Sequence, residues 1–569
     1  MNQPSPALVT QDAVRRLPRL ALLLLCVAYV LPGYIGREPW KNADITSFGY
    51  MLELVGASHL QAWLHPTLMG TPAETSALLP YWLGAWFIQL APGWIAPDFV
   101  VRIPFALMLS LTLAATWYAV YYLARNPSAQ PVAFAFGGEA KPADYARALA
   151  DGSLLALIAT LGLAQLSHET TPALAQLFFV SLVFYGFAAF PFRTLNATLA
   201  LAFGLPGLTL SGAPVMALIY GGVSALALLS PRVTPIEAPT RWRTFTAVLG
   251  GTLASAALAQ SLDLFRWSIE LPLADWDRWR IIGRLFLWFT WPAWPLVLWT
   301  LWRWRRYLLD MRQHRHLGLP FFMALVPVVA TVVTYANDRS LLLALPALAA
   351  LAAFALPTFK RSASAFIDWF TVLFFSVWAI VIWVVWLSLQ TGIPPKPAQN
   401  VARLAPGFEP VFQWLAFLAA LAGTLAWCML ARWRTGRHRT ALWKSLVLPA
   451  AGSTLCWLLL MTLWLPALDY ARSLAPQMRE VHRIVGPAPC VYAFGMSTPQ
   501  LAAARFHGGW MTQPLDSPER CSWLLVDVNA QKDLPAVLDT SQWVLTDRVS
   551  RPTEASDTLL IFKRTAPAR

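Results

Sequence analysis

The chain has 569 residues, 57% of them hydrophobic, with 29 Trp and 31 Phe and a mean hydropathy of +0.51. A water-soluble globular protein does not carry that much apolar surface, so the composition excludes a soluble enzyme and indicates an integral membrane protein. The net charge of +14 does not indicate a nucleic-acid partner, because the basic residues stand in short clusters between apolar runs. Such clusters are typical of the cytoplasmic loops of membrane proteins.

The first apolar run follows the basic sequence RRLPR and lacks a small-residue cleavage site, so we interpret it as a membrane span rather than a removed signal peptide. Apolar runs of about 17 to 25 residues are long enough to cross the hydrocarbon core as helices. With the N-terminus in the cytoplasm, an odd number of spans places the C-terminus outside and the basic clusters inside. Thirteen spans are predicted, at residues 18–35, 101–123, 150–166, 171–190, 194–211, 213–230, 244–261, 282–303, 318–335, 340–357, 364–389, 409–432 and 443–466.

One apolar segment, residues 78–95 (LLPYWLGAWFIQLAPGWI), is not counted as a span. It is short, rich in Trp and interrupted by Pro and Gly, and counting it would move every later basic cluster to the outer side. We therefore expect an interfacial helix there, within a first outer loop at residues 36–100. Residues 124–149 then form a cytoplasmic loop.

The composition changes at about residue 470. Four segments are typical of strands, CVYAFG, CSWLLVDV, QWVLTDRV and TLLIFKR, and TPQLAAARFHG after the first is typical of a helix. The sequence thus predicts a helical membrane domain, 1–469, followed by a small α/β domain on the outer side, 470–569. Cys490 and Cys521 open neighbouring strands in an oxidising compartment, so we expect a disulfide between them.

Most acids before the terminal domain fall in the predicted outer segments, which include GREPWKNADITSFGYM, LSHETTP and YANDRS. Ionisable groups close to the hydrocarbon are costly unless they are used. We therefore interpret these polar residues as a candidate site at the outer mouth of the bundle. Its members are Asp44, Glu74, His168, Glu169 and Asp338.

These outer segments resemble those of the GT-C class of polyprenyl-phosphate-dependent glycosyltransferases, most nearly the lipid A aminoarabinose transferase and the bacterial protein O-mannosyltransferase superfamily. The family's first outer loop has an acid before a Tyr-Ala pair, and a second acid before a Tyr-Trp pair. Here DITSFGYMLEL places Asp44 on the first acid, and WLHPTLMGTPAETSALLPYW places Glu74 on the second. FVVRIPFALML supplies the family's Arg-x-Pro entry to the second span, and HETTPALAQLFF resembles its acidic turn before the fourth.

The resemblance implies a GT-C-like fold of about thirteen transmembrane helices in the bacterial inner membrane, with a periplasmic α/β domain. It implies a polyprenyl-phosphate sugar as donor and an acceptor at the periplasmic face: lipid A, another glycan or a protein. The chain departs from the family at Ile45, Ser47 and Thr75, which replace an acid, an arginine and a lysine. Other cations must then hold the donor's phosphate, and the candidates are Arg37, Lys41, Arg266, Arg278 and Arg339.

Sugar transfer from such a donor needs a carboxylate that orients or deprotonates the acceptor, and positive charge on the leaving phosphate. The catalytic candidates are therefore Asp44, the preferred base, with Glu74 and Glu169. His65, His168 and Asp338 are candidates for acceptor contacts. A divalent metal is compatible with this chemistry, although no closely spaced His or Cys residues require one.

Each candidate also has a structural alternative. Asp44 is a suitable cap for a helix that begins at Ile45, and Glu38 suits a solvent pair with Arg37 or Lys41. Glu74 fits a solvated loop, the two histidines fit hydrogen-bonded packing, and Asp338 fits a local ion pair with Arg339.

Two other functions remain open. A lipid-linked-sugar flippase would need charges spread through the middle of the spans, whereas these cluster at one face, which favours the enzyme. A catalytically inactive scaffold derived from an enzyme would explain the missing arginine and lysine.

Overall fold

The computed structural model describes residues 7–73, 75–229, 238–266, 269–270, 275–308, 314–334, 337–359, 361–435 and 441–565. Glu74, one of the predicted catalytic acids, lies outside these residues. The chain divides into two compact units, each made of three segments. Unit 1 comprises residues 1–34, 105–380 and 418–459, and unit 2 comprises residues 35–104, 381–417 and 460–569.

Unit 1 is helical, and helices occupy every run that the sequence predicts as a span. They are α1 (Arg19–Val30), α5 (Pro97–Ala124, which begins in unit 2), α6 (Pro142–Ala159), α7 (Leu161–Leu166), α8 (Pro172–Ala189), α9 (Thr194–Leu210), α10 (Pro214–Leu229), α11 (Ala238–Ser261), α12 (Trp276–Phe289), α13 (Ala293–Arg303), α14 (Arg305–Leu308), α15 (Arg315–Val333), α16 (Asp338–Leu342), α17 (Leu345–Ala353), α18 (Arg361–Thr391, which ends in unit 2), α20 (Trp414–Thr435, which begins there) and α21 (Lys444–Leu460). α6 begins eight residues before the predicted span at 150, so part of the predicted cytoplasmic loop is helical.

Six of the described helical segments are long and apolar enough to cross a membrane: α5, α8, α15, α16 with α17, α18 and α20. Two further pairs pass the same criterion only together: α12 with α13, across a bend of 90°, and α21 with α22 (Leu465–Arg472). α1, α9 and α10 are shorter apolar helices. The protein is therefore a multi-span helical membrane protein, and thirteen spans stays a prediction.

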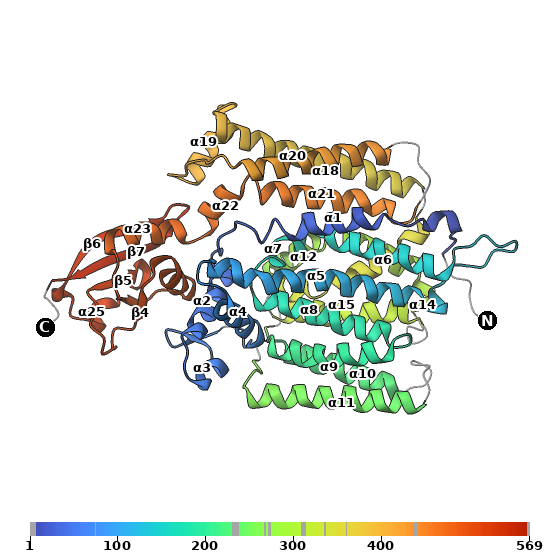
Figure 1. The fold of residues 1–569 in the computed structure, drawn as a ribbon, viewed down its shortest axis with the longest axis horizontal. Helices are drawn as coiled ribbons and strands as arrows, with labels where there is room; N and C mark the ends of the chain where they lie inside the picture. Colours follow the sequence, from blue (N-terminus) through green and yellow to red (C-terminus); the bar gives the residue numbers. More distant parts are fainter. Residues whose placement is uncertain are drawn as a thin grey trace. The chain divides into compact units, whose positions relative to one another are not determined.

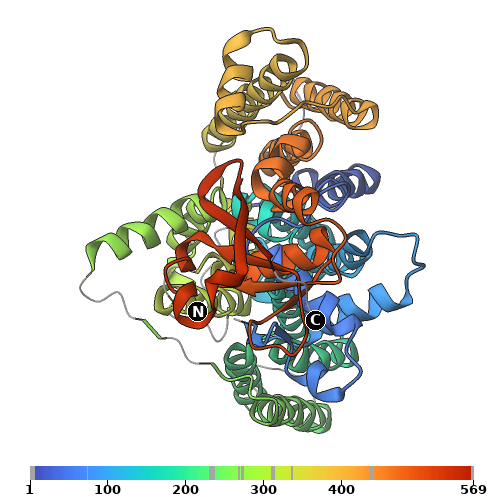
Figure 2. The same ribbon diagram turned by 90° about the vertical axis from the view of Figure 1, so that its left-hand side faces the viewer.

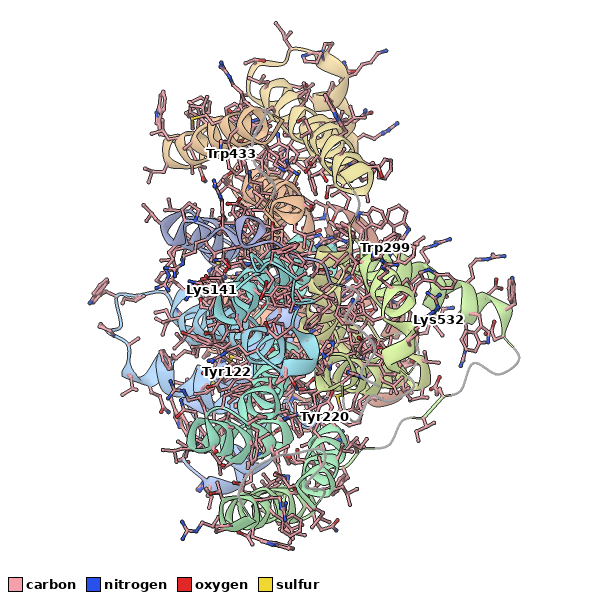
Figure 3. All side chains as sticks on the ribbon, turned by 90° about the vertical axis from the view of Figure 1, so that its right-hand side faces the viewer. Tyr122, Lys141, Tyr220, Trp299, Trp433 and Lys532 are labelled. Carbon is pink, nitrogen blue, oxygen red and sulfur yellow. A yellow bond between two sulfur atoms is a disulfide. The ribbon has the colours of Figure 1, made fainter. Side chains whose placement is uncertain are left out.

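The core of unit 1 is formed by apolar side chains between neighbouring helices. α8, α9, α10 and α11 lie side by side (Figures 1 and 2), and α8 approaches α9 closely at Gly186, where a Cβ would lie 2.8 Å from Leu201 Cγ. The buried Tyr220 of α10 (Figure 3) donates its hydroxyl to the Met323 carbonyl of α15 at 3.1 Å. Such bonds satisfy polar groups that have no access to water.

Unit 2 contains the predicted first outer loop. Its helices are α2 (Ala43–Val55), α3 (Leu60–Leu64), α4 (Leu79–Leu90), α19 (Pro395–Leu404), α22 (Leu465–Arg472) and α23 (Ala475–Val485), and the strands β1 (Thr67–Leu68) and β2 (Thr71–Pro72) form a short antiparallel hairpin. α4 has 12 residues, about 18 Å of helix, which is too short to cross a core of about 30 Å. It packs on α2, with Gly84 directly against Met51. The helix is confirmed; its place in the interface stays a prediction.

The end of the chain forms a five-stranded sheet in the order β4-β3-β5-β7-β6. The strands are β3 (Cys490–Phe494), β4 (Met511–Gln513), β5 (Trp523–Asp527), β6 (Trp543–Arg551) and β7 (Glu554–Arg564), with α24 (Thr498–Ala503) and α25 (Leu534–Val537) between them. β3 is parallel to β4 and β5, whereas β7 is antiparallel to β5 and β6. All four predicted strands are confirmed. β4 was missed because its three residues, MTQ, carry no apolar run.

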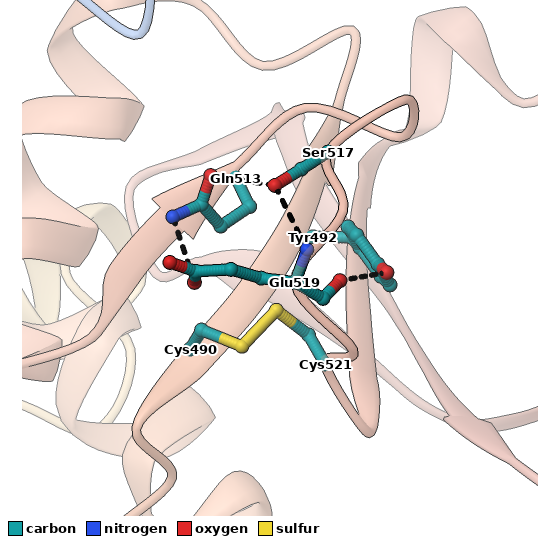
Figure 4. Close-up of a disulfide and its surroundings, with 6 residues drawn as sticks. All are labelled: Cys490, Tyr492, Gln513, Ser517, Glu519 and Cys521. Atoms are coloured by element: carbon teal, nitrogen blue, oxygen red, sulfur yellow. Dashed lines mark hydrogen bonds between the residues drawn. A yellow bond between two sulfur atoms is a disulfide. The ribbon is translucent and has the colours of Figure 1, made fainter. Parts of the chain in front are cut away.

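The predicted disulfide joins Cys490, the first residue of β3, to Cys521, two residues before β5 (Figure 4). Beside it, the Tyr492 hydroxyl donates to the Glu519 carbonyl, and Gln513 Nε2 donates to the Glu519 carboxylate at 2.9 Å. The bridge and these bonds fix the connection between β4 and β5 to the buried face of the sheet.

Candidate functional site

A buried ion pair joins the loop after α1 to the start of α2. Arg37 Nη2 donates to Asp44 Oδ2 at 2.6 Å, and the two side chains are 0% and 3% exposed. The backbone N–H of Trp40 donates to the same oxygen at 3.2 Å. α2 begins at Ala43, after a left-handed turn at Asn42 (φ 74°), so Asp44 lies in the first turn and not at the predicted cap before Ile45. Its carboxylate holds the preceding loop.

Arg37 has donors that the protein leaves unused. Its Nε and Nη1 are buried and have no hydrogen-bond partner among the described residues. Each buried N–H left unpaired costs about 1–3 kcal/mol, and such groups in folded proteins call for an explanation such as an absent ligand. A charged guanidinium N–H forms a strong hydrogen bond to a phosphate oxygen. Arg37 is therefore suited to receive an anion.

Two further charged residues belong to the same cluster. Arg102, at the start of α5, is buried and pairs with Asp98 at 3.1 Å, and it lies within the electrostatic reach of Arg37, Asp44 and Asp469. We call Arg37, Trp40, Asp44, Arg102 and Asp469 the Arg37 cluster.

Arg102 and Asp469 are not among the predicted site residues, although their positions in the sequence indicate them. Asp469 is the first acid after the last predicted span, so it lies near the predicted outer end of a span, as Asp44 does. Arg102 was noted only as part of a motif, although it is a cation at the predicted outer end of a span.

Lys41 and Glu38 are paired with residues of the terminal segment. Lys41 Nζ contacts Asp557 and lies 2.9 Å from Glu554. Glu38 accepts a hydrogen bond from Ser473 at 2.8 Å and pairs with Arg479 at 3.6 Å. The expected pairing of Glu38 with Arg37 or Lys41 is therefore wrong, because Arg37 turns inward to Asp44 and Lys41 turns to the β6–β7 hairpin.

α2 rests on the terminal domain. A Cβ at Gly49 would lie 2.6 Å from Ala502 Cβ of α24, and the Phe48 and Phe506 rings meet edge to face at 4.8 Å. Next to Phe506, burial and, to a smaller extent, the charge of Arg479 lower the pKa of His507 to about 4. The imidazole is thus neutral at physiological pH, and the helix that carries Asp44 is held by the sheet domain.

A second acid–arginine pair lies in unit 1. Glu169, in the turn between α7 and α8, accepts hydrogen bonds from Gln165 at 3.3 Å and from Arg339 Nη2 at 3.0 Å. The Glu169 side chain is 7% exposed and that of Arg339 is 30% exposed. Asp338 is exposed at the start of α16. Among the described residues, the ion pair of Arg339 is with Glu169 and not with its neighbour Asp338.

The remaining candidates with described positions are His168, Arg278, His65 and Arg266. His168 is fully buried, with Nε2 3.1 Å from the Tyr29 carbonyl and its ring against Trp457. Arg278 pairs with Asp275 at 3.2 Å and with Glu270 at 3.6 Å. His65 and Arg266 are exposed. Their predicted roles stay predictions, although the packing of His168 fits its structural alternative.

The described residues contain no group of three or more His, Cys, Asp or Glu side chains that would hold a metal ion. The Arg37 cluster itself offers a carboxylate beside arginines. A carboxylate accepts a proton or orients a hydroxyl, and an arginine stabilises a phosphate that leaves.

Comparison with known proteins identifies the fold. No protein-family model and no curated protein sequence matches the chain. The structure is similar to the crystal structure of ArnT from Cupriavidus metallidurans bound to undecaprenyl phosphate, with a TM-score of 0.56 and 13% identity over 96% of this chain and 98% of that one. It is similar to the apo form of the same ArnT with a TM-score of 0.55 and 14% identity over 95% and 96% of the two chains. The chain therefore has the fold of ArnT, a GT-C polyprenyl-phosphate glycosyltransferase, over almost its whole length.

Proposed function

We propose that this protein transfers a sugar from a polyprenyl-phosphate donor to an acceptor at the outer face of the bacterial inner membrane. The shared fold with ArnT supports the reaction class, because that protein was crystallised with undecaprenyl phosphate. The observation that carries the proposal is the buried Arg37, which pairs with Asp44 and keeps two N–H donors unused.

In this proposal the Arg37 cluster holds the donor's phosphate. Arg37 offers one of its unpaired groups, Nε or Nη1, to a phosphate oxygen, and the charge of Arg102 adds to the field at the phosphate. These two arginines take the place of the family's arginine and lysine, whose positions are Ser47 and Thr75 here. Lys41 is less suited, because two carboxylates already neutralise it.

The reaction forms a bond between the acceptor oxygen and the anomeric carbon while the bond from that carbon to the phosphate oxygen breaks. The electron pair leaves with the phosphate, where the arginines stabilise the charge. Asp44 takes the acceptor's proton as general base. The predicted roles of Glu169, Arg339 and Glu74 stay predictions.

The test measures two quantities on the purified protein in nanodiscs: affinity for undecaprenyl phosphate, and transfer of labelled sugar from a panel of polyprenyl-phosphate sugars to lipid A and peptide acceptors. Asp44→Asn is expected to lower turnover by about 100-fold or more, which is typical for the loss of a general base. Arg37→Gln is expected to weaken the binding of undecaprenyl phosphate.

Asp151→Asn, at a buried carboxylate of α6, is the matched control and should retain both turnover and phosphate binding. Equal turnover by wild type and Asp44→Asn would exclude Asp44 as the base. Binding without turnover across the panel would instead indicate a scaffold.

A further inference from the structure

The position of the Arg37 guanidinium depends on one aromatic ring. Two arginines lie over the ring of the buried Trp40, with Arg37 Cζ 4.6 Å and Arg472 Cζ 5.0 Å from its centroid. A desolvated cation over an indole is held by about 2 kcal/mol. The Trp40 ring therefore fixes where the guanidinium lies, in addition to the bond from Asp44.

Trp40 is in turn held by Asp469 of α22. Asp469 Oδ1 accepts the indole Nε1–H at 2.7 Å, and Oδ2 accepts the backbone N–H of Glu38 at 3.3 Å. The backbone N–H of Lys41 also donates to the Arg472 carbonyl at 2.8 Å. The Asp469 carboxylate thus holds the loop through two hydrogen bonds, one from Glu38 and one from Trp40.

The chemistry of this contact requires a carboxylate. Both groups that face Asp469 are N–H donors, so both oxygens must accept. An asparagine offers one acceptor, and its NH₂ would face a donor.

We infer that Asp469 is a positioning residue for phosphate binding, acting through Trp40 on Arg37. The inference rests on the proposed function, because it concerns the same phosphate site. Asp469 itself does not touch the phosphate; it keeps Nε and Nη1 of Arg37 in the orientation that receives it.

The experiment compares the affinities of the full-length protein in nanodiscs for undecaprenyl phosphate and for undecaprenol, which lacks the phosphate. The variants are Asp469→Asn, Trp40→Phe, which keeps an aromatic ring but removes the indole N–H, and the double variant. Each single variant is expected to bind undecaprenyl phosphate about tenfold more weakly, as for one hydrogen bond to a charged group. The double variant should lose little more, because both changes remove the same bond. Affinity for undecaprenol should not change.

The chain offers a matched control. Trp117 Nε1 donates to Asp151 Oδ1 at 2.8 Å within unit 1, the same kind of bond away from the Arg37 cluster. Trp117→Phe and Asp151→Asn should leave the affinity for both lipids unchanged. An equal loss in these variants would attribute the effect to general destabilisation and overturn the inference.

The outcomes separate the two proposals. A wild type that binds undecaprenyl phosphate no better than undecaprenol contradicts the proposed function. A wild type that prefers the phosphate, with Asp469→Asn and Trp40→Phe indistinguishable from it, overturns only the positioning role. Loss of both lipids in these two variants shows a merely structural role and also overturns it.

Discussion

The two acid–arginine pairs of this protein differ in which partner is sealed from solvent. In unit 2 both Arg37 and Asp44 are buried, whereas in unit 1 Glu169 is buried and Arg339 is 30% exposed. A buried charge that loses its partner has no water to replace it, but an exposed one does. Replacing either Arg37 or Asp44 should therefore strongly lower the free energy of unfolding. In the other pair, only the replacement of Arg339 should do so, because it leaves the buried Glu169 without that partner. We call Arg37 and Asp44 the sealed pair. The unpaired N–H groups of Arg37 place the candidate anion site at this pair.

The largest expected effect comes from breaking the sealed pair. Asp44→Leu leaves the Arg37 charge buried without a counter-charge and is expected to lower the free energy of unfolding by about 3–5 kcal/mol. Arg37→Met should cost a similar amount. The double variant should recover most of the loss, because replacing both charges by apolar groups removes the uncompensated charge. Thermal unfolding of the purified protein measures all three, and a double variant as unstable as the sum of the two singles would contradict the argument.

The second prediction uses the neutral histidine behind α2. Burial lowers the pKa of His507 to about 4, below the value of about 6.5 in the unfolded chain. The unfolded state therefore binds a proton first as the pH falls, so this contribution to stability is full above pH 6.5 and is lost between pH 6.5 and pH 4. The loss is at most about 3 kcal/mol. Unfolding midpoints at pH 7 and pH 5 should differ less in His507→Leu than in wild type, whereas His65→Leu, at an exposed histidine, should behave as wild type.

The contrast between the two pairs also shows what a single sequence can reveal. Long apolar runs and alternating strands were predictable, because they record burial in lipid or in a sheet, and so was the bridge between two cysteines that open neighbouring strands. The partner of each charge was not predictable. Lys41 and Arg37 are equivalent as cations in the sequence, yet Lys41 is paired with Glu554, 513 positions away, and Arg37 with Asp44, seven positions away. Asp469 was overlooked because it lies at the boundary between the last predicted span and the predicted terminal domain.

A third prediction tests the support of the sealed pair by the sheet domain. An added Cβ at Gly49 would lie 2.6 Å from Ala502 Cβ, so Gly49→Ala must push α2 away from α24 and should cost about 2 kcal/mol. Gly56→Ala is the control, since a Cβ there would meet only the Glu53 carbonyl at 3.8 Å. If the two variants unfold at the same temperature, α2 is not packed against α24 as described.

The smallest effects are expected at the half-exposed pair, where their order is informative. Glu169→Gln leaves Arg339 able to reach water and should cost less than about 1 kcal/mol. Arg339→Gln takes the guanidinium away from the buried Glu169 carboxylate and should cost more, about 1–3 kcal/mol, because a desolvated charge loses an ion-pair partner. Unfolding midpoints at low and high salt measure both. The opposite order would show that Arg339, and not Glu169, is the partner sealed from water, and the proposed contrast with Arg37 and Asp44 would then disappear.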